Sequence, residues 1–263
     1  MNNLVFDIRT SEKALESLTN ITQVPLSKWE EARRNISKYE CPEDFVEDTV
    51  LTNGYLPKNH RSFVFTFSHI TTSANECSSY KKHGLLDLRQ SYLCPDSELR
   101  VFLDQHNILI NVDEKVLSYN GKKHDITYSR GFATNLSEDY RRQVAFRFFK
   151  DSGVCGYLSM DPRSTYPGDV HLRPEILKNI DGLLGLSLSE EWKASRIPYE
   201  VTAIATGEKI EIFASEKSDK EIVVDFLTNA YNNAFGAISE KRLQLKSQIQ
   251  VVPADIINIQ PLT

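Results

Sequence analysis

The clearest pattern of apolar and polar positions lies in residues 61–84. Phe63–Phe67 is a run of aromatic and β-branched residues with one threonine, which is typical of a largely buried strand. The polar stretch after it contains Ser73 and Asn75, and either can cap a short helix that ends at Gly84. The pattern therefore predicts a strand, a polar exit and a short helix.

Residues 1–60 form a predicted N-terminal helical segment. The spacing of serine and glutamate in Ser27–Glu30 is that of a capping box, which opens a helix expected to reach about Tyr39. A second helix is expected to begin after Pro42 and to end near Gly54. The side chains expected to face the core of this segment are Trp29, Ile36, Phe45 and Val46.

The rest of the chain mixes short helices and strands without regular strand–helix–strand repeats. Helices are expected over 85–93, 95–105, 136–150, 174–184 and 217–235. Strands are expected over 108–112, 116–119, 122–126, 154–160, 198–205, 209–213 and 247–252. Asn120-Gly121 is a strong type I′ hairpin signal, and Thr206–Glu208 is expected to turn a second hairpin. This order favours an α+β fold over a doubly wound α/β fold.

Composition is that of an ordinary globular chain. Its 263 residues are 40% hydrophobic and 25% charged, with a net charge of −5, which gives no global case for binding nucleic acid. We expect a helical segment over 1–60 and one larger domain over 61–263. The longest apolar run is shorter than the roughly 18–20 residues that span a bilayer, and the first residues lack the features of a signal peptide. The sequence therefore predicts a cytoplasmic protein with no membrane partner.

The positions of the cysteines and the absence of common motifs argue against several kinds of site and enzyme. Cys41, Cys77, Cys94 and Cys155 form no CxxC pair and have no histidine at metal-ligand spacing, so free thiols and no metal site are expected. The sequence also lacks GxxxxGK[ST], GxGxxG, GxSxG and HExxH. These absences count against an NTPase, a Rossmann dehydrogenase, an α/β-hydrolase and a zincin.

His69 and Thr71 lie two residues apart at the end of the predicted strand, so their side chains should share one face. A His-x-Thr followed by a short helix and Gly-Leu-Leu resembles the first NAD-contacting motif of the ADP-ribosyltransferase superfamily. The resemblance implies that His69 binds ribose hydroxyls and that Thr71 supports the loop. A neutral imidazole can donate with one nitrogen and accept with the other, which suits a vicinal diol. The alternative is a histidine that only bonds a neighbouring loop.

A second stretch follows in the order of that family. Gly156–Ser159, with Tyr166 a few residues later, is similar to the part from which the family takes aromatic rings to stack on nicotinamide. Stacking on a tyrosine face would remove water and hold the ring near the angle for glycosidic cleavage. Tyr157 and Tyr166 are the candidates for this role. Alternatively, Tyr157 is a core residue and Tyr166 a turn residue.

The third stretch is Gln248-Ile249-Gln250, in the predicted strand 247–252 and ahead of Pro253. The family carries a glutamate here, often as Gln-x-Glu, so Gln248 and Gln250 correspond to the catalytic pair, with glutamine in place of the glutamate. That glutamate would stabilise the positive charge that develops on the ribose as nicotinamide leaves. An amide lacks this charge, and its absence should cost on the order of a hundredfold or more in rate.

Three explanations of Gln250 stay open. It is an engineered Glu→Gln change, the chain is a catalytically silent relative, or the acid lies elsewhere in the sequence. The candidate substitute acids are Glu200, Glu208 and Glu211, with Glu175 behind them.

Basic residues form two further candidate binding sites. Arg173 stands close to His171 at the start of a predicted helix, where an arginine can bind a phosphate such as the NAD pyrophosphate. A capping and salt-bridging loop is the alternative. The basic segment Arg141–Lys150 is either a solvated helix face or a surface that binds a target.

The resemblance covers the layout of residues 61–263 and is closest to histidine-type bacterial toxins, including the DarT and PARP-like types. It implies split antiparallel β-sheets with surrounding helices and an NAD cleft. It also implies mono-ADP-ribosylation of a macromolecular target, protein or nucleic acid, as a toxin with an antitoxin or as an antiviral defence effector. The alternatives are an enzyme like tRNA 2′-phosphotransferase and a non-catalytic module that binds NAD, a nucleotide or a partner.

Overall fold

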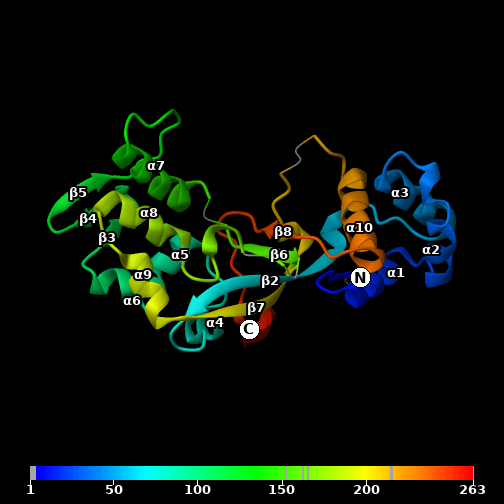
Figure 1. Cartoon of the computed structure of the whole chain (residues 1–263), viewed down its shortest axis with the longest axis horizontal. Coiled ribbons are helices and arrows are strands. Elements are labelled where there is room, and N and C mark those ends of the chain that lie inside the picture. Colours follow the sequence, from blue (N-terminus) through cyan, green and yellow to red (C-terminus); the bar gives the residue numbers. More distant parts are fainter. Residues whose placement is uncertain (1–3, 152, 162, 165, 214–215, 263) are drawn as a thin grey trace. The chain divides into compact units, whose positions relative to one another are not determined.

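The computed structural model describes residues 4–151, 153–161, 163–164, 166–213 and 216–262 (Figure 1). Its helices are α1 (Ser11–Thr22), α2 (Leu26–Arg33), α3 (Pro42–Asn53), α4 (Ser78–His83), α5 (Leu88–Leu93), α6 (Glu98–Gln105), α7 (Leu136–Phe149), α8 (Glu175–Leu184), α9 (Leu188–Ser195) and α10 (Asp219–Phe235). Its strands are β1 (Leu4–Phe6), β2 (Phe63–Ser73), β3 (Leu109–Asn111), β4 (Val116–Tyr119), β5 (Lys122–Asp125), β6 (Cys155–Ser159), β7 (Ile197–Thr206), β8 (Lys241–Gln244) and β9 (Ile256–Pro261).

The strands form two sheets. One has the order β8-β6-β2-β7-β9, with β1 added to β2, and the other has the order β3-β4-β5. The β2–β6, β6–β8, β3–β4 and β4–β5 pairs are antiparallel, whereas β1 runs parallel to β2. This mixture of helices with mainly antiparallel strands agrees with the predicted α+β class.

The chain forms two compact units. Unit 1 contains Met1–Ser68, Cys155–Ser164 and Thr202–Gln244, and unit 2 contains His69–Val154, Thr165–Val201 and Leu245–Thr263. Both β2 and β7 contribute residues to each unit. The expected division of the sequence into 1–60 and 61–263 stays a prediction.

Unit 1 has an aromatic core contributed by β1, β2 and α10. The ring of Phe6 stacks on that of Phe63 with centroids 5.9 Å apart, and Phe226 of α10 approaches Phe65 to 4.8 Å. A second buried group joins α2, α3 and α10 through Trp29, Phe45, Val46 and Tyr231. Three of the four expected core residues of the N-terminal segment are therefore buried. Ile36 is not, with 38% of its surface exposed.

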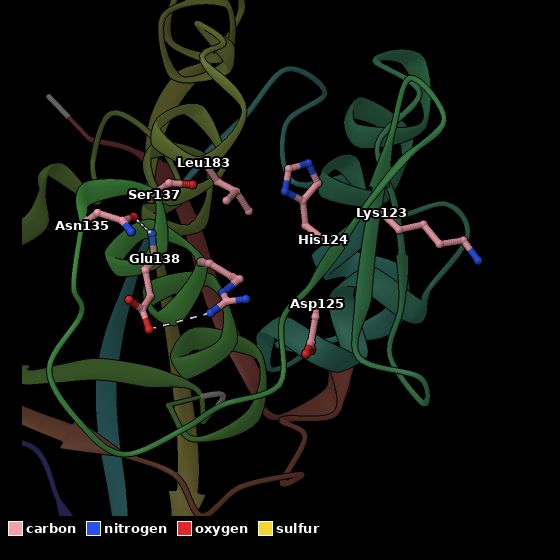
Figure 2. Close-up of a pocket in the computed structure, with 8 residues that line it drawn as sticks. Lys123, His124, Asp125, Asn135, Ser137, Glu138 and Leu183 are labelled. Atoms are coloured by element: carbon pink, nitrogen blue, oxygen red, sulfur yellow. Dashed lines mark hydrogen bonds and ion pairs between the residues drawn. The ribbon is translucent and has the colours of Figure 1, made fainter.

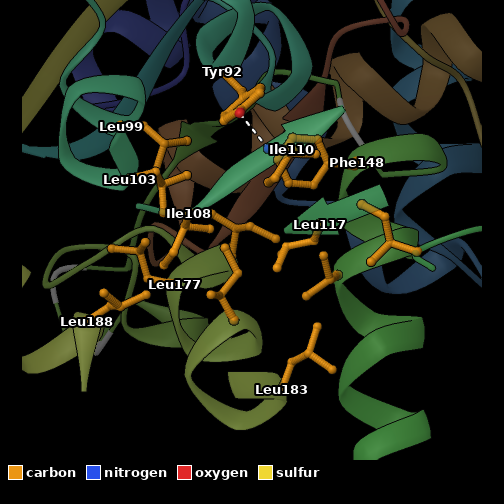
Figure 3. Close-up of a cluster of buried hydrophobic side chains, with 14 of the residues drawn as sticks. Tyr92, Leu99, Leu103, Ile108, Ile110, Leu117, Phe148, Leu177, Leu183 and Leu188 are labelled. Atoms are coloured by element: carbon orange, nitrogen blue, oxygen red, sulfur yellow. Dashed lines mark hydrogen bonds between the residues drawn. The ribbon is translucent and has the colours of Figure 1, made fainter. Parts of the chain in front are cut away.

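Unit 2 has its own core, which Figure 3 shows as a group of aliphatic side chains with Tyr92 and Phe148 at one end. Helices α5 to α9 and the hairpin strands contribute to it, and Leu177 and Leu188 are almost fully buried there. The Tyr92 hydroxyl accepts a hydrogen bond of 2.6 Å from the backbone N–H of Ile110. This bond ties α5 to β3 and satisfies a polar group that would otherwise be costly to bury.

Several local predictions are confirmed. Asn120 and Gly121 both have positive φ, 47° and 76°, as a type I′ turn requires between β4 and β5. Helix α3 begins at Pro42, and α7 covers Leu136–Phe149, where a helix was expected over 136–150. Gly84 ends α4 with a φ of 80°.

Other boundaries were wrong. Helix α2 starts at Leu26 behind Pro25 and ends at Arg33, so Ser27 lies inside the helix and forms no capping box. The cap of α4 is Cys77, whereas Ser73 uses its hydroxyl to accept the N–H of Cys77. Separate helices α1 and α9 and the strand β1 were not expected from the sequence.

Two expected strands are absent among the described residues. After β7 the chain forms a 3-10 turn at Gly207–Lys209 and continues irregularly, so the hairpin over 198–213 was wrong. The segment 247–252 is also irregular, because Gln248 has a left-handed φ of 67° and pairing is limited to a single bridge between Val251 and Leu85. The last strand is instead β9.

Candidate functional site

Helix α4 contacts both His69-x-Thr71 and Gln248-x-Gln250, which are the two candidate motifs farthest apart in the sequence. Its Tyr80 shares a hydrogen bond of 2.6 Å between its hydroxyl and that of Thr71. The Tyr80 ring also lies against the His69 ring, with centroids 6.2 Å apart. Burial raises the pKa of Tyr80 well above its ordinary value, so the hydroxyl stays protonated. Sequence reasoning missed Tyr80, whose only signal was its position on the helix that follows His-x-Thr.

His69 and Thr71 share a face, as their spacing predicts. Both are half-buried, whereas Ile70 and Thr72 between and beyond them are buried on the opposite face of β2. The hydroxyl of Thr72 accepts a hydrogen bond of 2.7 Å from the indole N–H of Trp192. The core therefore fixes one face of this strand end and leaves the face of His69 accessible.

The C-terminal motif lies along the turn that follows α4. Leu85 and Val251 exchange two backbone hydrogen bonds of 2.9 and 3.0 Å. The side-chain amide of Gln250 donates to the backbone carbonyl of His83, the last residue of α4. Helix α4 and the residue after Gly84 thus contact both His-x-Thr and Gln-x-Gln.

Gly84 makes this close approach possible. A Cβ at this position would lie 1.8 Å from the carbonyl oxygen of Val251, and the φ of 80° is one that side chains disfavour. The glycine in Gly-Leu-Leu is therefore required by the segment 246–251 as well as by the end of α4.

Gln248 is held by the capping box of α5. Asp87 accepts the N–H of Gln90 through Oδ1 at 2.7 Å and the N–H of Gln248 through Oδ2 at 3.1 Å. The Gln90 amide donates to the Gln248 carbonyl, also at 3.1 Å. These bonds replace strand pairing, which is why 247–252 is not a strand. Gln248 and Gln250 consequently do not share a strand face, contrary to expectation.

Tyr166 and Arg173 belong to another loop of unit 2. The Tyr166 ring lies 5.1 Å from the His171 ring, and burial together with the Glu200 carboxylate raises the pKa of Tyr166. Arg173 is buried, and its guanidinium donates to the carbonyl of Gly168 at 3.3 Å and to Asp169 at 3.4 Å. Arg173 therefore stabilises its own loop through these hydrogen bonds, as the alternative interpretation expects. Its phosphate-binding role stays a prediction.

Tyr157 lies in unit 1, on β6, where it is 8% exposed and pairs with Ser68 and Arg242. This burial favours a core role.

The candidate substitute acids also divide between the units. Glu208 and Glu211 belong to unit 1, whereas Glu175 and Glu200 belong to unit 2.

Within unit 2, Glu175 is held by Arg147 at 3.0 Å and Glu200 accepts a hydrogen bond from Gln260 at 3.0 Å. Glu200 is the candidate acid whose charge acts on Tyr166.

The basic residues of the segment Arg141–Lys150 have acidic or aromatic partners. Arg142 pairs with Asp139, and Arg147 contacts both Asp151 and Glu175. The ammonium group of Lys150 lies 5.8 Å from the centre of the Tyr128 ring. These contacts neutralise much of the positive charge, so they favour the solvated helix face over the target-binding surface.

Unit 2 also contains a polar cavity of about 350 Å³ between β5, α7 and α8 (Figure 2). The residues that line it are Lys123, His124, Asp125, Asn135, Ser137, Glu138, Arg141 and Leu183. Burial lowers the pKa of His124, with smaller contributions from Lys122 and Arg141, so this imidazole is neutral at pH 7. Two of the lining residues are engaged at the start of α7: Asn135 accepts the N–H of Glu138, and Glu138 accepts the N–H of Thr134.

No described helix combines the length and the apolar character needed to cross a membrane. Comparisons with protein-family models, with curated proteins and with solved structures find no match.

Proposed function

We propose that this chain is an ADP-ribosyltransferase-like protein that binds NAD in unit 2 and acts on a macromolecular target. The observation that carries the proposal is the position of α4. Its Tyr80 contacts His69 and Thr71, and its last carbonyl accepts the amide of Gln250. Two motifs that resemble those of one family, although almost 180 positions apart in the chain, thus contact the same short helix.

The polar residues of the two motifs are of types that can hydrogen-bond the ribose hydroxyls of NAD. The imidazole of His69 is half-buried, and an imidazole nitrogen is a group that can hydrogen-bond a ribose hydroxyl. The backbone of Gln248 is fixed by Asp87 and Gln90, while its side chain is exposed and can bond a ribose hydroxyl. In the reaction, nicotinamide leaves the ribose and a nucleophile of the target attacks the anomeric carbon. The neutral Gln250 offers no charge to that transition state, so we expect slow transfer.

Calorimetry with NAD tests the binding step. We expect NAD to bind the wild-type chain and the His69→Ala variant to lose at least tenfold in affinity. His124→Ala, which alters the separate polar cavity of unit 2, is the matched control and should bind NAD normally. Absence of NAD binding to the wild-type chain would overturn the proposal.

A second function is favoured by the Gln250 contact. If the amide serves only to hold the His83 carbonyl, the chain is a module that binds NAD without transferring ADP-ribose. Nicotinamide release by the Gln250→Glu variant separates the two. A gain of about a hundredfold supports the enzyme, and unchanged release with intact NAD binding supports the module. Mass spectrometry of cell extract treated with NAD and this variant would then identify ADP-ribose on protein or on nucleic acid.

A further inference from the structure

Three metal-ligating side chains converge beside the C-terminal end of α4. They are His83, the last residue of α4, Cys94, which follows α5, and Asp96 in the turn before α6. Their donor atoms all lie within 4.8 Å of one another. Asp96 Oδ1 is the shared neighbour, 2.8 Å from His83 Nε2 and 3.2 Å from Cys94 Sγ.

The contact between His83 and Asp96 is short but is not a well-formed hydrogen bond. His83 Nε2 is shielded from solvent and, within the described part of the chain, has no partner in hydrogen-bond geometry despite the nearby carboxylate. A buried ring nitrogen without a hydrogen-bond partner, next to a carboxylate oxygen and a thiol, is an arrangement that a shared cation would satisfy.

We propose that His83, Cys94 and Asp96 form a Zn²⁺ site. One imidazole, one thiolate and one carboxylate are all normal zinc ligands, and solvent would occupy the fourth position of a tetrahedron. Ligands bound at zinc distances lie about 3.3–3.7 Å apart. The three donor atoms, which already lie within 4.8 Å of one another, would have to shift to these separations, and Asp96 Oδ1 would move away from His83 Nε2, which is now at 2.8 Å. Ca²⁺ and Mg²⁺ fit poorly because they require mostly oxygen ligands. Binding releases the proton of the Cys94 thiol to solvent.

Metal binding would also affect the candidate NAD site, although the metal site itself does not depend on NAD. The carbonyl of His83 accepts the Gln250 amide, so a metal on the His83 ring fixes the residue that positions Gln250. Lys82 acts against the metal, because its ammonium pairs with the other carboxylate oxygen of Asp96. This arrangement makes Lys82 a determinant of affinity.

Cobalt spectroscopy of the whole chain tests the site. Co²⁺ added to metal-stripped protein should bind once per chain and give a thiolate-to-cobalt charge-transfer band, which Zn²⁺ removes by displacement. The band should disappear in Cys94→Ser, and Asp96→Asn should weaken binding at least tenfold. The control, Cys155→Ser, changes an exposed cysteine outside the site and should keep the band. The absence of a band, or a band that survives Cys94→Ser, would overturn the proposal.

Two further measurements guard against variants that fail to fold. Lys82→Gln removes a competing positive charge and should bind Zn²⁺ several-fold more tightly than the wild-type chain. Zn²⁺ should raise the thermal unfolding midpoint of the wild-type chain but not that of a folded Cys94→Ser variant. Equal zinc affinity in wild type and Lys82→Gln, together with no thermal shift, would contradict the site. Neither readout requires NAD, so failure here is distinguishable from failure of the proposed function.

Discussion

The side-chain amide of Gln250 donates a hydrogen bond to the backbone carbonyl of His83. An ionised glutamate has no proton to donate, so at this position it would place a carboxylate against a carbonyl oxygen. Gln250 is thus suited to its surroundings in a way that the glutamate implied by the family resemblance is not. A glutamate here would have to turn away from His83.

We expect Gln250→Glu to lower the free energy of unfolding at pH 8 by about 1–2 kcal/mol, because a hydrogen bond is replaced by a repulsive contact. The carbonyl raises the pKa of the introduced carboxyl above its value in the unfolded chain. The penalty is therefore present above that folded-state pKa and disappears as the pH falls towards about 4.3, where the acid can donate.

Urea titrations between pH 4.5 and pH 8 measure this effect. Gln248→Glu is the control, because its side chain is exposed, and it should leave stability nearly unchanged. Equal stability of wild type and Gln250→Glu at pH 8 would show that the contact contributes nothing.

Gly84→Ala should destabilise the protein by about 3 kcal/mol or more, since the added methyl meets the Val251 backbone. Gly185→Ala is the matched control, because Gly185 also has a positive φ, 69°, but faces open space. It should cost about 1–2 kcal/mol, from the left-handed backbone alone. Thermal unfolding of both variants measures the difference, and equal losses would mean that the approach of Val251 is not close.

Trp192→Phe should lower stability by about 1–2 kcal/mol, because the buried hydroxyl of Thr72 loses the indole donor at 2.7 Å. Thr72→Val removes the other partner. In a double-mutant cycle the two changes should couple by about 1 kcal/mol. Simple additivity of the two losses would contradict the hydrogen bond.

The pair of His106 and Glu191 should make stability depend on pH. Burial lowers the pKa of His106, but the Phe102 carbonyl and the Glu191 carboxylate, 2.8 Å away, raise it by more, so the net pKa lies above 6.5. This contribution is fully present below pH 6.5 and is lost as the pH rises through the folded-state pKa. Because Glu191 is 59% exposed, the effect should stay below about 1 kcal/mol and weaken with salt.

Unfolding of wild type and Glu191→Gln at pH 5.5 and pH 8 tests this expectation. The variant should lose stability relative to wild type at pH 5.5 and match it at pH 8. The opposite order would show that His106 is held neutral.

The sequence by itself determined the elements whose signals are local. The aromatic run of β2, the Asn120-Gly121 turn and the long amphipathic α10 depend on neighbouring residues only, and the structure contains all of them. The shared face of His69 and Thr71 also followed from strand periodicity alone.

The conformation of the C-terminal motif depends on tertiary contacts. The apolar pattern of 247–252 predicts a strand, but its partner is the turn after α4, where Asp87 and Gln90 satisfy the Gln248 backbone in place of a ladder. Likewise, His83, Cys94 and Asp96 have no ligand spacing in the sequence, and the fold brings the last residue of α4 next to the segment that follows α5. Such contacts join residues of different elements, and their geometry depends on how whole elements pack, which local patterns do not encode.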